Sequence, residues 1–124
     1  MKSIVFISLL LSFSIPFLNE EQLEKQLKKN KTTVIEFYAS WNDINSVKEL
    51  ASLKGCDVYR VDIDKEPALQ AKYNIVVVPT IVVFNKGKEL KRYQANLLFQ
   101  MCPSSFSCKK IQDKIDNLTM NKFR

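Results

Sequence analysis

The thiols of this chain that could carry redox chemistry belong to three cysteines, Cys56, Cys102 and Cys108. Cys102 and Cys108 enclose five residues, so an oxidising compartment would join them in a small structural disulfide. A displaced redox pair is the alternative, although five intervening residues is a wide spacing for thiol–disulfide exchange. Cys56 begins an apolar stretch, and we expect it to be a buried free thiol.

The composition excludes other kinds of site. The sequence contains no histidine, which is the commonest general base and metal ligand near neutral pH. No residues have the spacing of a zinc site, so we expect no metal and no other cofactor. The net charge of +6 is spread along the chain, without aromatic residues alternating with basic ones. We therefore expect no binding of nucleic acid.

Alternating apolar segments of strand and helix length predict an α/β domain. The expected strands cover residues 15–18, 33–39, 56–63, 76–84 and 89–93. The expected helices cover 20–29, 42–53, 64–73 and a C-terminal segment with an apolar stripe at Ile111, Ile115 and Leu118. Asn19 is the expected cap of the first helix, and residues 85–88 are the expected hairpin turn.

Glu36 is a carboxylate within the otherwise apolar expected strand 33–39. Burial of a carboxylate is costly unless the group is paired. Arg60 stands on the strand expected alongside, so we predict a structural ion pair between Glu36 and Arg60. A residual role of Glu36 in binding is the alternative.

Four short motifs, in this order and spacing, resemble the thioredoxin family: Glu36-Phe37-Tyr38-Ala39-Ser40-Trp41, Val61-Asp62-Ile63-Asp64, Val78-Pro79-Thr80 and Phe84-Asn85-Lys86-Gly87. The resemblance covers roughly Pro16 to Leu118. It implies a thioredoxin fold, which is a three-layer α/β sandwich of order β-α-β-α-β-α-β-β-α with a mixed central sheet. In that family a Trp-Cys-Gly-Pro-Cys motif begins a helix. Here the two cysteine positions are Asn42 and Asn45.

An asparagine amide cannot replace the thiolate that performs disulfide exchange, so the resemblance implies a redox-inactive site without a catalytic residue at Asn42 or Asn45. Pro79 aligns with the cis-proline of the family, which implies a cis Val78–Pro79 bond. It also implies a peptide-sized groove lined by Trp41, Asn42, Val78 and Pro79. The alternative is that these residues only maintain the fold.

Residues 1–14 are expected to be a signal peptide. Lys2 precedes an apolar run, and small serines stand at positions −3 and −1 of a cleavage site after Ser14. The run is too short to span a bilayer, so we expect no membrane span in the mature domain of residues 15–124. The domain would then be exported to a periplasm, to the outside or to a secretory lumen. A native edge strand is the alternative.

Three hypotheses for the function follow. The first is an exported, redox-inactive thioredoxin-like domain that binds a polypeptide or protein partner through the predicted groove. The second is an enzyme, a thiol–disulfide oxidoreductase that uses Cys102 and Cys108 or else Cys56. The third is a structural subunit whose interface is the apolar segment Leu97–Phe106. The missing active-site cysteines favour the first.

Overall fold

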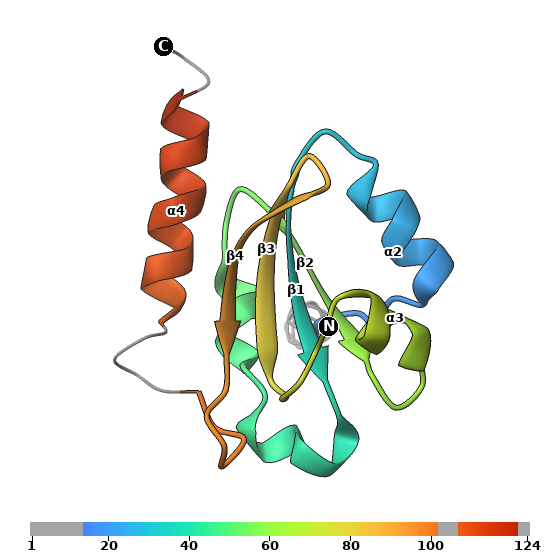
Figure 1. Ribbon diagram of the computed structural model, residues 1–124. Coiled ribbons are helices and arrows are strands. Elements are labelled where there is room, and N and C mark those ends of the chain that lie inside the picture. The colour runs from blue at the N-terminus through green and yellow to red at the C-terminus, as the bar shows by residue number, and fades with distance from the viewer. Residues whose placement is uncertain (1–13, 102–106, 122–124) are drawn as a thin grey trace, which may run out of the picture.

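The computed structural model describes residues 14–101 and 107–121 (Figure 1). In chain order the elements are α2 (Glu20–Leu27), β1 (Thr32–Tyr38), the 3-10 helices η1 (Ser40–Asn45) and η2 (Lys48–Ser52), β2 (Asp57–Asp62), α3 (Pro67–Lys72), β3 (Thr80–Asn85), β4 (Lys88–Gln94) and α4 (Cys108–Asn121). Among these residues, none of the helices is both long and apolar enough to cross a membrane.

The four strands form one mixed sheet in the order β2-β1-β3-β4, which confirms the predicted central sheet. β1 runs parallel to β2 and antiparallel to β3, and β3 runs antiparallel to β4. In β1, Phe37 lies opposite Val61 of β2 and Thr80 of β3. A strand in the middle of a covered sheet is apolar on both faces, which explains the continuous apolar run in β1.

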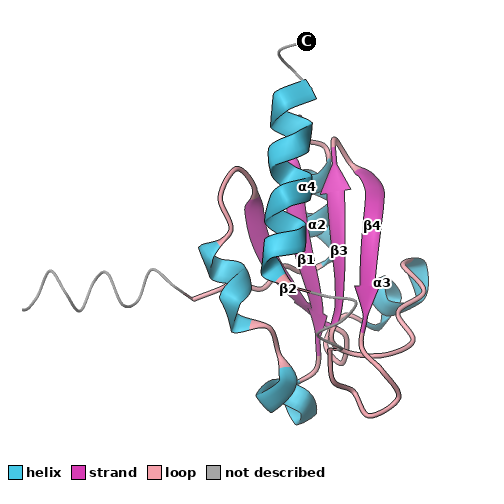
Figure 2. Cartoon of the chain, turned by 90° about the vertical axis from the view of Figure 1, so that its left-hand side faces the viewer, coloured by secondary structure: helices cyan, strands magenta, loops and turns pink. Residues whose placement is uncertain are grey.

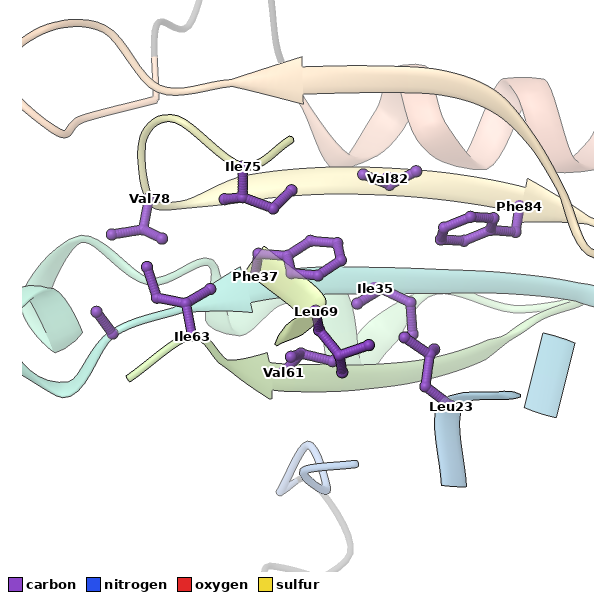
Figure 3. Packing of buried hydrophobic residues seen from close by; sticks show 11 residues of the cluster. Leu23, Ile35, Phe37, Val61, Ile63, Leu69, Ile75, Val78, Val82 and Phe84 are labelled. Carbon is purple, nitrogen blue, oxygen red and sulfur yellow. The ribbon is translucent and has the colours of Figure 1, made fainter. Parts of the chain in front are cut away.

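Helices cover both faces of the sheet, and each face has its own core (Figures 1 and 2). Successive side chains of a strand point to opposite faces, so Ile35 and Phe37 pack on one side while Val34 packs on the other. Figure 3 shows the core on the side of α2 and α3, with these buried residues: Leu23, Ile35, Phe37, Ala39, Val61, Ile63, Leu69, Ile75, Val78, Val82 and Phe84. The opposite core contains Ile15, Val34, Val47, Leu50, Leu53, Ile81, Val83, Tyr93, Ile111 and Ile115.

The N-terminal prediction is partly confirmed. The expected strand 15–18 is reduced to a single parallel bridge between Phe17 and Arg60, at the outer edge of β2. The Asn19 side chain caps α2, and it forms a reciprocal capping box with Gln22. α2 ends at Leu27, two residues before the expected end.

The predicted hairpin between β3 and β4 is confirmed, and it requires a glycine. Lys86 and Gly87 both have positive φ angles, of 54° and 82°. A Cβ atom on Gly87 would lie 2.6 Å from the Leu27 carbonyl oxygen, so no larger residue fits there without a shift of the backbone. This contact places the hairpin against the end of α2.

The predicted helix over residues 42–53 is wrong. The segment forms η1 and η2 instead, separated by the extended residues Ser46 and Val47. The Val47 N–H donates to a Glu36 carboxylate oxygen at 3.0 Å, whereas a continuous α-helix would direct it to the carbonyl four residues earlier. The expected apolar stripe is therefore divided, because Val47 and Leu50 are buried while Ile44 is 88% exposed.

The C-terminal helix α4 is confirmed, with Ile111 and Ile115 buried against the sheet. Two of the sequence-based predictions fall on residues outside the described ranges. One is the signal peptide, of which only Ser14 is described, and the other is the Cys102–Cys108 disulfide.

Candidate functional site

Three segments meet at one end of the sheet and form the candidate site. They are η1 after β1, the Val78–Pro79 segment before β3, and the loop of residues 95–101 after β4 (Figure 1). The Val78–Pro79 peptide bond is cis, as predicted. The Ala95 N–H donates to the Pro79 carbonyl at 3.0 Å, so the pairing of β3 with β4 continues by one hydrogen bond into the loop.

Asn42 is the polar centre of this site, with only 7% of its surface exposed. Its Nδ2 group donates to the Val78 carbonyl at 3.1 Å and to the Phe99 carbonyl at 3.0 Å. Its Oδ1 atom accepts a hydrogen bond from Asn45 Nδ2 at 2.7 Å. Both amide protons of Asn42 are therefore bonded, and Asn45 fixes the orientation of the amide. The two asparagines form a neutral hydrogen-bonded clasp at the positions that the resemblance aligns with the family's cysteines.

Phe99 is the residue of this site that the sequence analysis missed. Its ring meets the Trp41 ring edge to face, with centroids 5.2 Å apart. The loop turns here because Asn96 Oδ1 accepts from the backbone N–H groups of Leu98 and Gln100, at 2.9 and 3.1 Å. Phe99 itself has a φ of +60°. The apolar character of residues 97–106 was the only signal, and it did not indicate which segment the loop would meet.

The predicted groove residues come together, but the space between them is filled. Asn42, Val78 and Pro79 line a small hollow, which is too small to hold a water molecule. The Val78 carbonyl, which the family resemblance leaves free for a bound peptide, accepts from Asn42 instead. Trp41 remains 59% exposed on the outside of this filled site.

The predicted ion pair between Glu36 and Arg60 is present below the site. Arg60 Nε lies 2.9 Å from a Glu36 carboxylate oxygen, and the two side chains are 11% and 0% exposed. Burial raises the pKa of Glu36 above its usual value, and the opposing charge of Arg60 limits the increase. The Arg60 guanidinium also lies over the Tyr38 ring, 5.3 Å from its centroid. Glu36 thus joins β1, β2 and Val47 into one unit.

The two described cysteines lie apart from Asn42, in the core beside α4. Cys56 and Cys108 are half-buried and pack against the cluster that contains Ile111. Burial raises the pKa of the Cys56 thiol to about 11, and it raises the pKa of Cys108 as a free thiol. Both groups are therefore protonated and weakly nucleophilic at neutral pH. Within residues 14–101 and 107–121, no group of three potential ligands could hold a metal ion.

Comparisons with known proteins found a matching family and solved structures of similar fold. The thioredoxin family model matches residues 14–100. The thioredoxin of Mycoplasma genitalium is 32% identical over 78 residues, which cover 58% of this chain and 76% of that protein. A mutant thioredoxin from Halobacterium salinarum has a TM-score of 0.64 at 20% identity, over 86% of this chain and 91% of that one. The thioredoxin of Malassezia sympodialis has a TM-score of 0.64 at 20% identity, over 84% and 90% of the two chains.

The solved structures show the fold, which confirms the predicted thioredoxin architecture. The matched range includes Asn42, Asn45 and the Val78–Pro79 segment. Since the family model spans more than half of the sequence, the chain belongs to the thioredoxin family.

Proposed function

We propose that this protein is an exported, redox-inactive thioredoxin-like domain that binds a polypeptide or protein partner at its degenerate active site. The observation that carries the proposal is the contact between two solvent-accessible aromatic rings beside Asn42, those of Trp41 and Phe99. We use the name Trp41 surface for the exposed apolar side chains of the two segments that meet there, which are Trp41 and Ile44 of η1 and Leu97, Leu98 and Phe99 of the loop. Leu97 is 89% exposed, and exposed apolar side chains on adjoining segments are typical of an interaction site.

The chemistry at Asn42 supports the absence of disulfide exchange. Exchange needs one thiolate that attacks and a second thiol that resolves the mixed disulfide. The amides of Asn42 and Asn45 supply neither, and both are engaged in hydrogen bonds. The relatives are named thioredoxins, which favours the oxidoreductase alternative, but that alternative would have to use cysteines outside this site.

The Trp41 surface also unites two of the hypotheses. The interface proposed for the structural-subunit alternative begins at Leu97, and the loop that carries Leu97 contacts the site through Phe99. A partner bound at Trp41 would therefore touch this loop as well. The predicted groove residues Trp41 and Asn42 are thus in contact with the apolar loop through Phe99.

The first test is enzymatic. Insulin reduction with dithiothreitol should proceed at the same rate with and without the protein, because no exchange-competent thiol occupies the site. Turnover above the background that disappears in Cys108→Ser or Cys102→Ser would instead establish the oxidoreductase alternative.

The second test measures binding without exchange. S-carboxymethylated insulin B chain, which cannot form disulfides, should shift backbone NMR signals in η1 and in residues 95–101. Trp41→Ala should weaken this binding by about tenfold, the equivalent of about 1.4 kcal/mol. Met120→Ala is the matched control because Met120, on α4, is 58% exposed and Trp41 is 59% exposed. Equal binding by both variants, or no shift in these segments, would contradict the proposal.

A further inference from the structure

The loop of residues 95–101 contacts the candidate site in the way that a bound ligand would. It offers the Phe99 carbonyl to Asn42 Nδ2 at 3.0 Å, and it places the Phe99 ring against Trp41. The backbone hydrogen bond from Ala95 to Pro79 holds the loop next to the cis-proline. The loop therefore makes three separate contacts with the site, at Asn42, Trp41 and Pro79.

Asn96 shapes the turn of the loop, because its Oδ1 atom accepts from the Leu98 and Gln100 N–H groups. Within this turn Phe99 adopts a φ of +60°, a region that is uncommon for a bulky aromatic residue. Met101 at the end of the loop packs against the core, whereas the Leu97 and Leu98 side chains at its tip are exposed. Phe99 is therefore the described residue through which the tip of the loop is attached to the site.

We propose that the loop tip, residues 96–100, is an internal ligand of Trp41 and Asn42, and that the partner polypeptide displaces this tip by presenting its own aromatic side chain. This inference rests on the proposed function and names the class of partner for the same site. The aromatic ring would replace Phe99 beside Trp41, and a backbone carbonyl next to it would accept from Asn42 Nδ2. Without that acceptor, a largely buried amide proton would lose its partner, which disfavours ligands that supply only apolar surface.

The internal ligand lowers the apparent affinity for a partner, since both compete for one surface. A loop that is seated for 90% of the time weakens external binding by about tenfold relative to a loop that is always open. Variants that unseat the loop should therefore bind an aromatic ligand more tightly, although they remove contacts from the free protein.

The experiment uses the full chain and two readouts. Trp41 is the single tryptophan, so its fluorescence reports whether Phe99 is seated. The binding probe is N-acetyl-phenylalanine methylamide, which carries one aromatic ring and backbone carbonyls, and N-acetyl-alanine methylamide is its control. Phe99→Ala removes the internal ring, and Asn96→Ala removes the acceptor that shapes the loop. Leu90→Ala is the matched control, because Leu90 on β4 is 40% exposed and Phe99 is 38% exposed.

We expect Phe99→Ala and Asn96→Ala to change Trp41 emission, while Leu90→Ala leaves it as in the native protein. Phe99→Ala should bind the phenylalanine probe about tenfold more tightly than the native protein does, and the alanine probe should bind neither. Native emission in Phe99→Ala, equal affinity of the two proteins, or equal binding of the two probes would overturn the inference. If the insulin B chain still binds at the Trp41 surface in that case, the proposed function stands and only the internal ligand is wrong.

Discussion

Two pairs of polar side chains hold different parts of this domain together. Glu36 and Arg60 are a buried charged pair that joins β1, β2 and the start of η2. Asn42 and Asn45 are neutral, and they join η1 to the cis-proline segment and a surface loop. Asn42 is also buried, but a neutral amide that loses its partners costs less than an unpaired buried charge does.

The two pairs should differ in how much of the domain depends on them. The Glu36–Arg60 pair stabilises the domain without a thiol beside it. Asn42 and Asn45 connect η1 to the cis-proline segment and to the loop of residues 95–101. Loss of the pair should therefore damage the whole domain, while loss of the clasp should free one loop.

The largest expected effect comes from Arg60→Met. The substitution leaves Glu36 buried without its cation, which should lower the free energy of unfolding by about 3–5 kcal/mol in urea denaturation. Lys72→Met is the control, because the pair of Lys72 with Glu24 has a distance of 3.8 Å and both side chains are about half exposed. That change should cost less than about 1 kcal/mol. Similar losses of unfolding free energy in Arg60→Met and Lys72→Met would show that the buried pair stabilises the domain no more than the exposed pair does.

Asn42→Asp should have the next largest effect. A carboxylate cannot donate to the Val78 and Phe99 carbonyls, so two hydrogen bonds are lost and like partial charges face one another. We expect a loss of about 2–3 kcal/mol, with faster amide exchange at Phe99 and Gln100 and unchanged protection in β1. Asn45→Ala removes only the bond to Asn42 Oδ1 and should cost about 1 kcal/mol. Uniformly faster amide exchange across the sheet would contradict the prediction that Asn42 stabilises only the neighbouring loop.

The free energy of unfolding should depend on pH through Glu36 but not through Asn42. Because the pKa of Glu36 is raised in the folded state, its favourable contribution is complete below its unfolded pKa near 4.5 and is lost as pH rises through the raised value. Native protein should therefore lose stability relative to Glu36→Gln over that window, by at most about 1.4 kcal/mol per pH unit. The comparison of Asn42→Ala with native protein should show no such slope, and urea titrations between pH 4 and 8 measure both. A parallel pH profile for native protein and Glu36→Gln would refute the effect.

The smallest expected effect concerns the reactivity of the cysteines. With a pKa of about 11 against an ordinary 9.0, Cys56 should have about a hundredfold smaller thiolate fraction than a free thiol at pH 7.5. Its alkylation by iodoacetamide should be correspondingly slow in native protein and normal in urea. If the protein is exported, mass mapping should find Cys102 bonded to Cys108 and Cys56 free. Rapid native alkylation of Cys56, or a bridge to it, would reopen the oxidoreductase alternative.

The sequence by itself determined the elements whose signals are local. The Asn19 cap, the hairpin at residues 85–88 and the strand character of β1 each depend on residue types within a few positions. The Glu36–Arg60 pair was also predictable, because a carboxylate in a buried strand needs a cation and Arg60 stood on the neighbouring strand. The family motifs predicted the cis bond at Val78–Pro79, which is part of the candidate site.

Only the tertiary structure decided how that site is closed. The segment 42–53 has a helical apolar pattern, but the Val47 N–H is taken by Glu36, eleven positions earlier, and the helix divides into η1 and η2. Asn42 meets the Phe99 carbonyl across 57 positions of sequence, where no periodic pattern connects them. Hydrogen bonds between distant segments form only after the sheet has brought the segments together, so their partners cannot be inferred from spacing along the chain.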